Sequence, residues 1–299
     1  MTGLSDDIER CAAETEAFLD ACLTGANGIL SGASPRLIEA MRHGTLGGGK
    51  RLRPFLLRAT ARLFGIPDAG SLRTGAAVEL VHCYSLIHDD LPEMDNDRLR
   101  RGQPAVWAAF DPATAILAGD ALLTLAFALL ADAETHPDPA VRIEFVYRLS
   151  HAAGAAGMVG GQMRDIEAEI RPPGEAEAEL IPAMKTASLI AAAAAMGARL
   201  GSAGKDPFEA LHRYGHDAGL AFQLADDILD VTQSSEALGK TSGKDGAQHK
   251  ATLVARLGIE TARARRDGHV EKAIGRLDGF GPEADRLREL VRYFAARQA

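Results

Sequence analysis

The stretch Asp89-Asp90-Leu91-Pro92-Glu93-Met94-Asp95 decides the fold of this chain, together with a second cluster, Asp226-Asp227-Ile228-Leu229-Asp230. Both clusters lie in otherwise apolar segments, since Ser-Leu-Ile-His precedes the first and Phe-Gln-Leu-Ala precedes the second. A buried carboxylate is costly unless it is paired or coordinates a cation. Two such clusters therefore indicate Mg²⁺ held between two helices, and the metal in turn indicates a phosphorylated substrate.

The second cluster has the simpler geometry. At about 100° per residue, Asp226 and Asp230 lie on one face of a helix and Asp227 is turned away. A single acidic pair is more often a helix cap or solvated surface. That interpretation is weaker here, because the chain has two such acidic clusters and a similar apolar segment precedes each of them.

Pro92 shapes the first cluster. It lacks a backbone N–H and clashes with the preceding turn, so a helix arriving through residues 80–88 should end or kink near it. We expect Asp95 to reach the metal past this distortion.

Basic residues accompany both acidic clusters. Gly47-Gly48-Gly49-Lys50-Arg51-Leu52-Arg53-Pro54 combines three cations with a glycine turn whose backbone N–H groups can approach an anion closely. It is not a Walker loop, and a lone basic cluster is often only a solvated patch. Further cations follow the first cluster (Arg98, Arg100, Arg101) and the second (Lys240, Lys244). This order suits two diphosphate sites, where carboxylates bind Mg²⁺ and Arg or Lys neutralises the remaining charge.

Several motifs resemble those of the trans-isoprenyl diphosphate synthases, most closely the bacterial farnesyl diphosphate synthases. They are Gly-Gly-Lys-Arg-Leu-Arg-Pro (48–54), His82 to His88, Leu99-Arg100-Arg101-Gly102, Gly119 to Leu123, Gly161-Gln162, Lys185-Thr186 and Phe222 to Asp227. The resemblance implies an all-α fold, a large antiparallel helical bundle around a deep central cavity. It also implies a single polyprenyl synthetase domain over residues 1–299 and a homodimer.

The reaction that the resemblance implies is head-to-tail prenyl transfer. An allylic diphosphate (dimethylallyl or geranyl) ionises, isopentenyl diphosphate attacks the cation, and a proton is lost to give farnesyl diphosphate. Three Mg²⁺ ions per site are implied, with Asp89, Asp95 and Asp226 as metal ligands. Isopentenyl diphosphate would be held by Lys50, Arg53, His82 and Arg101, and the allylic diphosphate by Arg100, Lys185 and Lys240. Lys185, Thr186 and Gln223 are the implied catalytic residues, and Gln162, Asp165 and Lys244 have no assigned role.

Tyr84 is the candidate chain-length residue, because it lies five residues, more than one helical turn, before Asp89. A bulky side chain there would stop growth at fifteen carbons. A geranylgeranyl diphosphate synthase is the alternative. Asp226 to Asp230 and the Lys50 region argue against a terpene cyclase. A non-catalytic synthase subunit is also disfavoured, because it would have lost an aspartate or a lysine that binds diphosphate.

Composition agrees with a globular protein that binds no nucleic acid. The 299 residues are 46% hydrophobic, and the formal charge of −8 argues against nonspecific binding to nucleic acid. Three cysteines without a CxxC pair and an acidic N-terminus without signal-peptide features predict a cytoplasmic protein.

One apolar segment, residues 113–131, is about long enough to span a bilayer, but Asp120 interrupts it. We expect a core or dimer-interface helix there, with a helix boundary at Gly119 and Asp120, and no membrane span. Helical periodicity also predicts helices over 8–23, 35–41, 76–88, 140–158 and 283–296. The stretch 231–250 is predicted to be a functional loop, with lysines that could cover the diphosphate.

Overall fold

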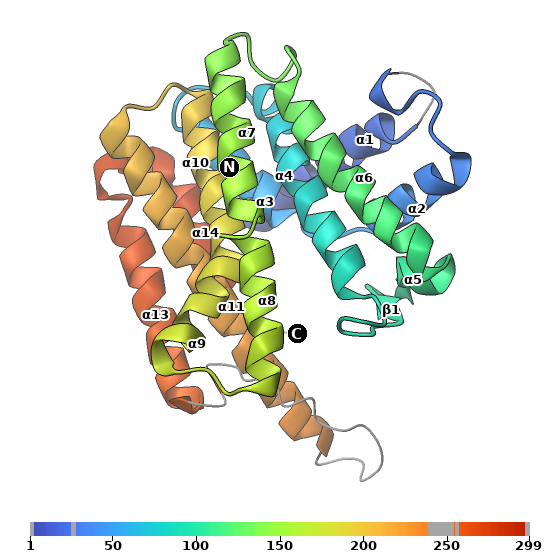
Figure 1. Ribbon diagram of the computed structural model, residues 1–299. Coiled ribbons are helices and arrows are strands. Elements are labelled where there is room, and N and C mark those ends of the chain that lie inside the picture. Colours follow the sequence, from blue (N-terminus) through green and yellow to red (C-terminus); the bar gives the residue numbers. More distant parts are fainter. Residues whose placement is uncertain (1–2, 25–27, 239–253, 255–256, 297–299) are drawn as a thin grey trace. The chain divides into compact units, whose positions relative to one another are not determined.

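The computed structural model describes residues 3–24, 28–238, 254 and 257–296 (Figure 1). These residues form two compact units, Met1–Tyr147 and Arg148–Ala299. The predicted all-α fold is confirmed, because the only strands in the described ranges belong to one short hairpin. The single domain predicted over residues 1–299 stays a prediction.

The first unit is built from helices that pack around α4, together with the hairpin. In chain order its elements are α1 (Leu4–Cys22), η1 (Gly28–Leu30), α2 (Pro35–Thr45), α3 (Leu52–Arg62), α4 (Asp68–Asp89), β1 (Leu99–Arg100), β2 (Gln103–Pro104), α5 (Val106–Ala109), α6 (Pro112–Ala131) and α7 (Pro139–Ala153), which continues past the unit boundary. α4 packs against α3 and α6, and Phe55, Leu80 and Leu122 are fully buried between these helices. The packing holds the end of α4, and so the first aspartate cluster, in a fixed place.

The second unit is built around α10 and α11. In chain order its elements are α8 (Met158–Ile170), α9 (Glu175–Pro182), the π-helical turn η2 (Ala183–Ala187), α10 (Ser188–Leu200), α11 (Lys205–Leu238), α13 (Ile259–Gly275), the 3₁₀ helix η3 (Asp278–Ala284) and α14 (Asp285–Ala295). The alanine run 191–195 is buried, which lets α10 and α11 pack closely. Tyr214 donates a hydrogen bond to the carbonyl of Leu287, 2.7 Å away, and so joins α11 to α14.

Most predicted helices are present; most of their boundaries differ by a few residues, but α4 begins at Asp68, eight residues before the predicted start at 76. The predicted helix over 140–158 is divided, because α7 ends at Ala153 and α8 begins at Met158. The predicted loop over 231–250 is helical at its start, since α11 continues to Leu238. The rest of that stretch lies outside the described residues.

The predicted helix boundary at Gly119 and Asp120 is wrong. α6 begins at Pro112 and runs through both residues. Its N-cap is Asp111, whose carboxylate accepts a 2.8 Å hydrogen bond from the Thr114 N–H. Gly119 serves packing instead, because a Cβ there would lie 2.1 Å from the ring Nε2 of His88 on α4. Asp120 is exposed, so its charge does not require the helix to end there.

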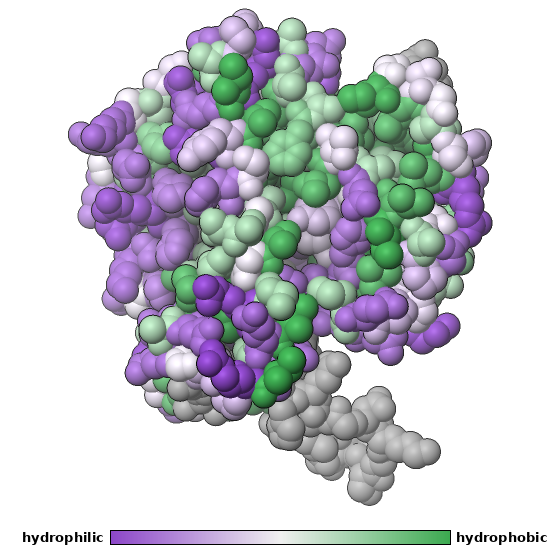
Figure 2. Space-filling view, in the orientation of Figure 1, coloured by the Kyte–Doolittle hydropathy of each residue, from purple (hydrophilic) through white to green (hydrophobic). Residues whose placement is uncertain are grey.

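Two helical stretches are long and apolar enough to cross a bilayer, Pro112–Ala131 and Glu175–Leu200. In their most apolar windows, 44% of the residues of the first and 72% of the residues of the second are buried inside the protein, so the second is mostly buried and the first is not. α6 buries one face on α4 and exposes Ile116 and Leu117 on the other. Figure 2 shows the apolar surface that α6 contributes on this side of the molecule.

Candidate functional site

The first aspartate cluster begins where α4 ends. The helix stops at Asp89, as the proline predicted, and the chain then turns back so that the Asp95 N–H donates a 2.9 Å hydrogen bond to the Asp89 carbonyl. The turn uses Asn96 with a φ of 53°, a conformation that asparagine tolerates better than most residues. Both Asp89 and Asp95 are half-buried. The backbone contact therefore brings together the two residues predicted to bind metal in this unit.

Asp90, the middle carboxylate of the cluster, pairs with an arginine. It is 2% exposed and accepts hydrogen bonds from the guanidinium of Arg100, one of them 3.0 Å long from Nε. This pair connects the end of α4 to strand β1, which carries Arg100. Asp90 is thus paired with Arg100, and the predicted metal ligands do not include it.

A second arginine, Arg101, lies in the two-residue turn of the hairpin. Arg101 and Gly102 both have positive φ, as the favoured two-residue hairpin turns require. The guanidinium of Arg101 donates to the carbonyl of Gly48 and lies directly against Gly49, where a Cβ would be 2.8 Å from it. Gly49 also has a φ of +124°, so no other residue would suit this position. The predicted glycine turn and Arg101 therefore form one structure.

His82 lies on α4 among these cations. Burial, followed by the positive charges of Arg53 and Arg101, holds the pKa of His82 well below its usual range. The imidazole is therefore neutral at pH 7 and can donate one hydrogen bond to an anion. Lys50 is exposed beside Gly49 and Arg53 is half-buried in the first turn of α3. All four residues predicted to bind isopentenyl diphosphate thus belong to one unit.

Tyr84 is on the buried side of α4 and only 5% exposed. Its ring packs edge-on against the ring of His88, with the centroids 5.7 Å apart. Burial, and to a lesser extent the charge of Asp89, raise the pKa of Tyr84 to about 12. The phenol is therefore near the first aspartate cluster and stays protonated.

In the second unit, Lys185 and Thr186 lie in the π-helical turn η2 that interrupts the helix formed by α9 and α10. Such turns are rare and often occur at functional sites. α8 packs tightly on this turn because Gly161 has no side chain: a Cβ there would be 2.2 Å from the backbone nitrogen of Lys185. On the same helix, Asp165 forms a 2.5 Å ion pair with the Lys185 ammonium group.

Thr186 and Gln223 belong to a chain of hydrogen bonds that ends at Asp227. The Thr186 hydroxyl donates to the side-chain oxygen of Gln223 at 2.6 Å, and the Gln223 amide nitrogen donates to the Asp227 carboxylate at 2.8 Å. These bonds fix which end of the Gln223 amide faces each partner. Asp227 is half-buried, and this contact holds its carboxylate in place.

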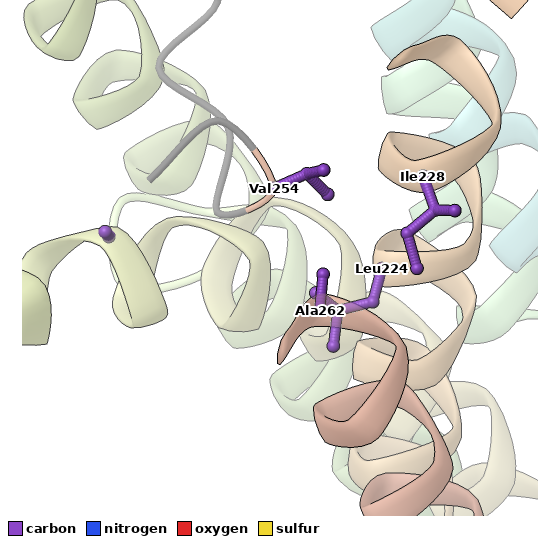
Figure 3. Close-up of a cluster of buried hydrophobic side chains, with 5 residues drawn as sticks. Leu224, Ile228, Val254 and Ala262 are labelled. Carbon is purple, nitrogen blue, oxygen red and sulfur yellow. The ribbon is translucent and has the colours of Figure 1, made fainter. Parts of the chain in front are cut away.

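The opposite face of α11 explains why Asp226 and Asp230 point away from the core. Leu224 and Ile228 of α11 pack with Val254 and Ala262 in a buried apolar cluster, completed by Ala178 (Figure 3). On a helix, residues two positions along from this pair lie on roughly the opposite side. Asp226 is accordingly half-buried and Asp230 exposed.

The residues of the second unit fit a hard divalent cation. Burial raises the pKa of Asp227 to about 6; the Gln223 hydrogen bond opposes this, whereas the charges of Asp226, Asp230 and Asp165 add to it. Among the described residues, the buried side-chain oxygen of Gln162 has no hydrogen-bond partner. Carboxylates that repel one another around Asp227 are the oxygen ligands that Mg²⁺ prefers, and a bound cation would relieve their repulsion. No group of three or more His, Cys, Asp or Glu in the described ranges forms a ready-made metal site.

Some predicted site residues cannot be placed, and one residue was overlooked. Lys240 and Lys244 lie outside the described residues. Asp165, left without a role by the sequence, is the partner of Lys185. Arg51 was counted only as one charge of a basic cluster, although it is completely buried; its place between two exposed or half-exposed cations gave no signal of this.

Comparisons with known proteins identify the family of this chain. Residues 34–292 match the polyprenyl synthetase family, and this range contains both aspartate clusters and the glycine turn. The chain is 45% identical over 259 residues to farnesyl diphosphate synthase of Escherichia coli, covering 83% of this chain and 86% of the relative. It is 39% identical over 309 residues to the large subunit 1 of the heterodimeric geranylgeranyl pyrophosphate synthase of Arabidopsis thaliana, covering 98% and 83%. A crystal structure of an FPP/GFPP synthase from Zymomonas mobilis superimposes with a TM-score of 0.87 at 41% identity, covering 98% of this chain and 99% of that one.

Proposed function

Because this chain belongs to the polyprenyl synthetase family, we propose that it is a trans-prenyltransferase, a farnesyl diphosphate synthase. It condenses isopentenyl diphosphate head-to-tail with dimethylallyl and then geranyl diphosphate, and releases diphosphate. The observation that carries this proposal is the family match over residues 34–292, which contains two carboxylate clusters that each have cationic neighbours. The identity of 45% to a farnesyl diphosphate synthase supports the fifteen-carbon product.

Family membership implies dependence on a divalent metal, and we assign Mg²⁺, with three ions per site. Asp89 and Asp95 of the first unit and Asp226 of the second would hold it. Mg²⁺ is commonly bound by one or two carboxylates together with water and substrate phosphates, so a pre-formed cage of three side chains is not required. When bound, the metal supplies Lewis-acid stabilisation of the charge that develops on the departing diphosphate.

The protein's own cations complete the two diphosphate sites. Lys50, Arg53, His82 and Arg101 bind isopentenyl diphosphate, because three positive charges and one neutral imidazole donor gather around the glycine turn. Arg100, Lys185 and Lys240 bind the allylic diphosphate. Arg100 is paired with Asp90, and Lys185 with Asp165. These two carboxylates hold the cations in place, and the cations share their remaining N–H donors with the phosphate oxygens.

Ionisation of the allylic substrate leaves a carbocation that must not be trapped by a strong nucleophile. The only hydroxyl proton of Thr186 is donated to Gln223, so the lone pairs of the Thr186 oxygen remain available to the positive charge. Lys185, Thr186 and Gln223 thus stabilise the reacting groups without acting as a base. The released diphosphate accepts the proton that is lost in the last step.

Tyr84 sets the length of the product. It is buried, bulky and close to Asp89, as a residue that blocks the growing tail must be. Geranylgeranyl diphosphate is the second candidate product, since a geranylgeranyl pyrophosphate synthase subunit is 39% identical over 98% of this chain.

We also propose that the protein is a cytoplasmic homodimer. The exposed side chains of Ile116 and Leu117 on α6 and of Ile143 and Tyr147 on α7 support a second copy as the partner.

The test is incubation of the purified protein with isopentenyl diphosphate, dimethylallyl diphosphate and Mg²⁺, followed by chromatography of the dephosphorylated alcohols. Farnesol is expected as the main product, and chelation of the metal should abolish it. Geranylgeraniol would assign the alternative product. A cyclic hydrocarbon would identify a terpene cyclase, and no product at all would indicate a non-catalytic subunit.

A further inference from the structure

Arg51 is the one charged residue of the Gly-Lys-Arg-Leu-Arg run (49–53) that the proposed mechanism does not use. It stands between Lys50 and Arg53, yet its side chain is 0% exposed, whereas Lys50 is exposed. Its backbone has φ 46° and ψ 45°, a left-handed conformation that is unfavourable for a residue with a side chain. A strained backbone persists only where the surroundings hold it in place.

The side chain of Arg51 provides that hold. Its Nη1 donates to Glu79 Oε1 at 2.9 Å on α4, and its Nη2 donates to Glu16 Oε2 at 3.2 Å on α1. Nη2 also donates to the carbonyl of Thr45 at 2.5 Å, in the last turn of α2. One guanidinium therefore ties the start of α3 to three other helices. Figure 1 labels all four helices, α1 to α4.

These contacts join the two sides of the proposed isopentenyl diphosphate site. Arg51 directly follows Lys50 and fixes the first turn of α3, which carries Arg53. On the other side, its partner Glu79 is three residues before His82 on α4. The charge of Arg51 is countered by Glu79 and Glu16, and its burial keeps it from touching a substrate. Its contribution must therefore come from geometry.

We propose that Arg51 is a positioning residue that holds Lys50 and Arg53 at the correct distance from His82 and so sets the affinity for isopentenyl diphosphate. The inference rests on the proposed function. It predicts a selective effect: loss of Arg51 weakens the binding of isopentenyl diphosphate, whereas the affinity for the allylic diphosphate changes little.

The decisive variant replaces both members of the buried pair, Arg51→Met with Glu79→Leu. Exchanging a buried ion pair for apolar residues of similar size is often neutral for stability, whereas removal of one partner leaves an uncompensated charge. The double change removes one positive and one negative charge, so any loss of affinity cannot come from a change in net charge.

The chain offers a matched control in Arg58, on the same helix. It is also buried, at 3% exposed, and pairs with Glu14 of α1 at 2.7 Å and with Asp68 at 3.5 Å. Arg58→Met with Glu14→Gln therefore also removes a buried arginine of α3 together with a carboxylate that it contacts, in this case a half-exposed one on α1, away from the glycine turn.

Both variants are compared with the wild type by calorimetric titration with isopentenyl diphosphate and by the KM for each substrate. We expect isopentenyl diphosphate to bind at least tenfold more weakly to the Arg51/Glu79 variant, with the allylic KM within twofold of wild type. The Arg58/Glu14 variant should match the wild type for both substrates. Unchanged isopentenyl diphosphate binding by a folded Arg51/Glu79 variant, or equal weakening in the control, would overturn the proposal.

Circular dichroism shows whether the variants are folded. Should the double variant not fold, the variant Arg51→Lys provides the test. Its ammonium group is a single nitrogen, which replaces the two Nη atoms that donate separately to Glu79 and to Glu16 with the Thr45 carbonyl. At least threefold weaker isopentenyl diphosphate binding is expected, and unchanged binding would refute the positioning role. A wild-type protein that forms no prenyl product would instead contradict the proposed function, so the two failures are distinguishable.

Discussion

The hydrogen-bond chain Thr186–Gln223–Asp227 predicts a graded response to substitution. Thr186→Val removes one neutral hydrogen bond of 2.6 Å, which contributes about 1 kcal/mol to the free energy of unfolding. Gln223→Leu removes that bond and also the 2.8 Å bond to the Asp227 carboxylate, and a bond to a charged group contributes about 1.5–3 kcal/mol. The expected losses are therefore about 1 kcal/mol for Thr186→Val and about 2.5–4 kcal/mol for Gln223→Leu.

Thermal unfolding measures these losses. Gln223→Leu should lower the Tm by roughly 5–15 °C, and Thr186→Val by a few degrees. Thr232→Val is the matched control, because the Thr232 hydroxyl donates only to carbonyls of its own helix, Ile228 at 3.0 Å and Leu229 at 2.9 Å. It should change neither Tm nor turnover appreciably, whereas both site variants should lose at least about tenfold in turnover, since one preorganised group commonly contributes 10²–10³-fold. The reasoning fails if Gln223→Leu is no less stable than Thr186→Val.

Three further predictions test other parts of the site. Arg53→Ala should mainly weaken the binding of isopentenyl diphosphate, and Lys240→Ala mainly the binding of the allylic substrate, because each charge-assisted contact is made to one anion. Substrate titrations measure both affinities, and equal losses of both in each variant would contradict the assignment. Tyr84→Ala should shift the product toward twenty carbons or longer while Tyr84→Phe, which keeps the ring, should not; chromatography of the alcohols decides, and an unchanged length in Tyr84→Ala would place the block elsewhere. The pKa of His82 is lowered in the folded state, so below pH 6.5 the unfolded state binds a proton more readily, and the free energy of unfolding falls as the pH decreases, by at most about 1.4 kcal/mol per pH unit from this group. Between pH 7 and pH 5 the Tm of His82→Gln should therefore fall less than the Tm of the wild type. An identical fall would show that His82 does not titrate in this way.

Sequence reasoning located the helices and the chemistry because both depend on local patterns. The end of α4 at Asp89 followed from the proline nearby. Helical periodicity indicated that Asp227 is turned away from the face shared by Asp226 and Asp230, and its carboxylate accepts a hydrogen bond from Gln223. The family motifs supplied the candidate site residues, whose roles stay proposals.

Features that depend on neighbours distant in the sequence were missed. Gly119 suggested a helix end, but its true partner is His88, 31 positions earlier on α4. Arg51 suggested a surface charge, but its partners Glu16 and Glu79 lie on two other helices. The Lys185–Asp165 pair depends on the packing of α8 against η2 at Gly161, which no single-sequence pattern reveals.

The central claim is that two carboxylate clusters act together on the departing diphosphate. Turnover of Asp89→Ala and Asp226→Ala at saturating Mg²⁺ tests it most directly, with circular dichroism to confirm that each variant is folded. Removal of a single group from a preorganised charge-stabilising site can lower the rate by about 10²–10³-fold, and a metal ligand should cost at least that much. We therefore predict that each variant loses several orders of magnitude in turnover, and near-normal turnover by either one would contradict the two-cluster mechanism.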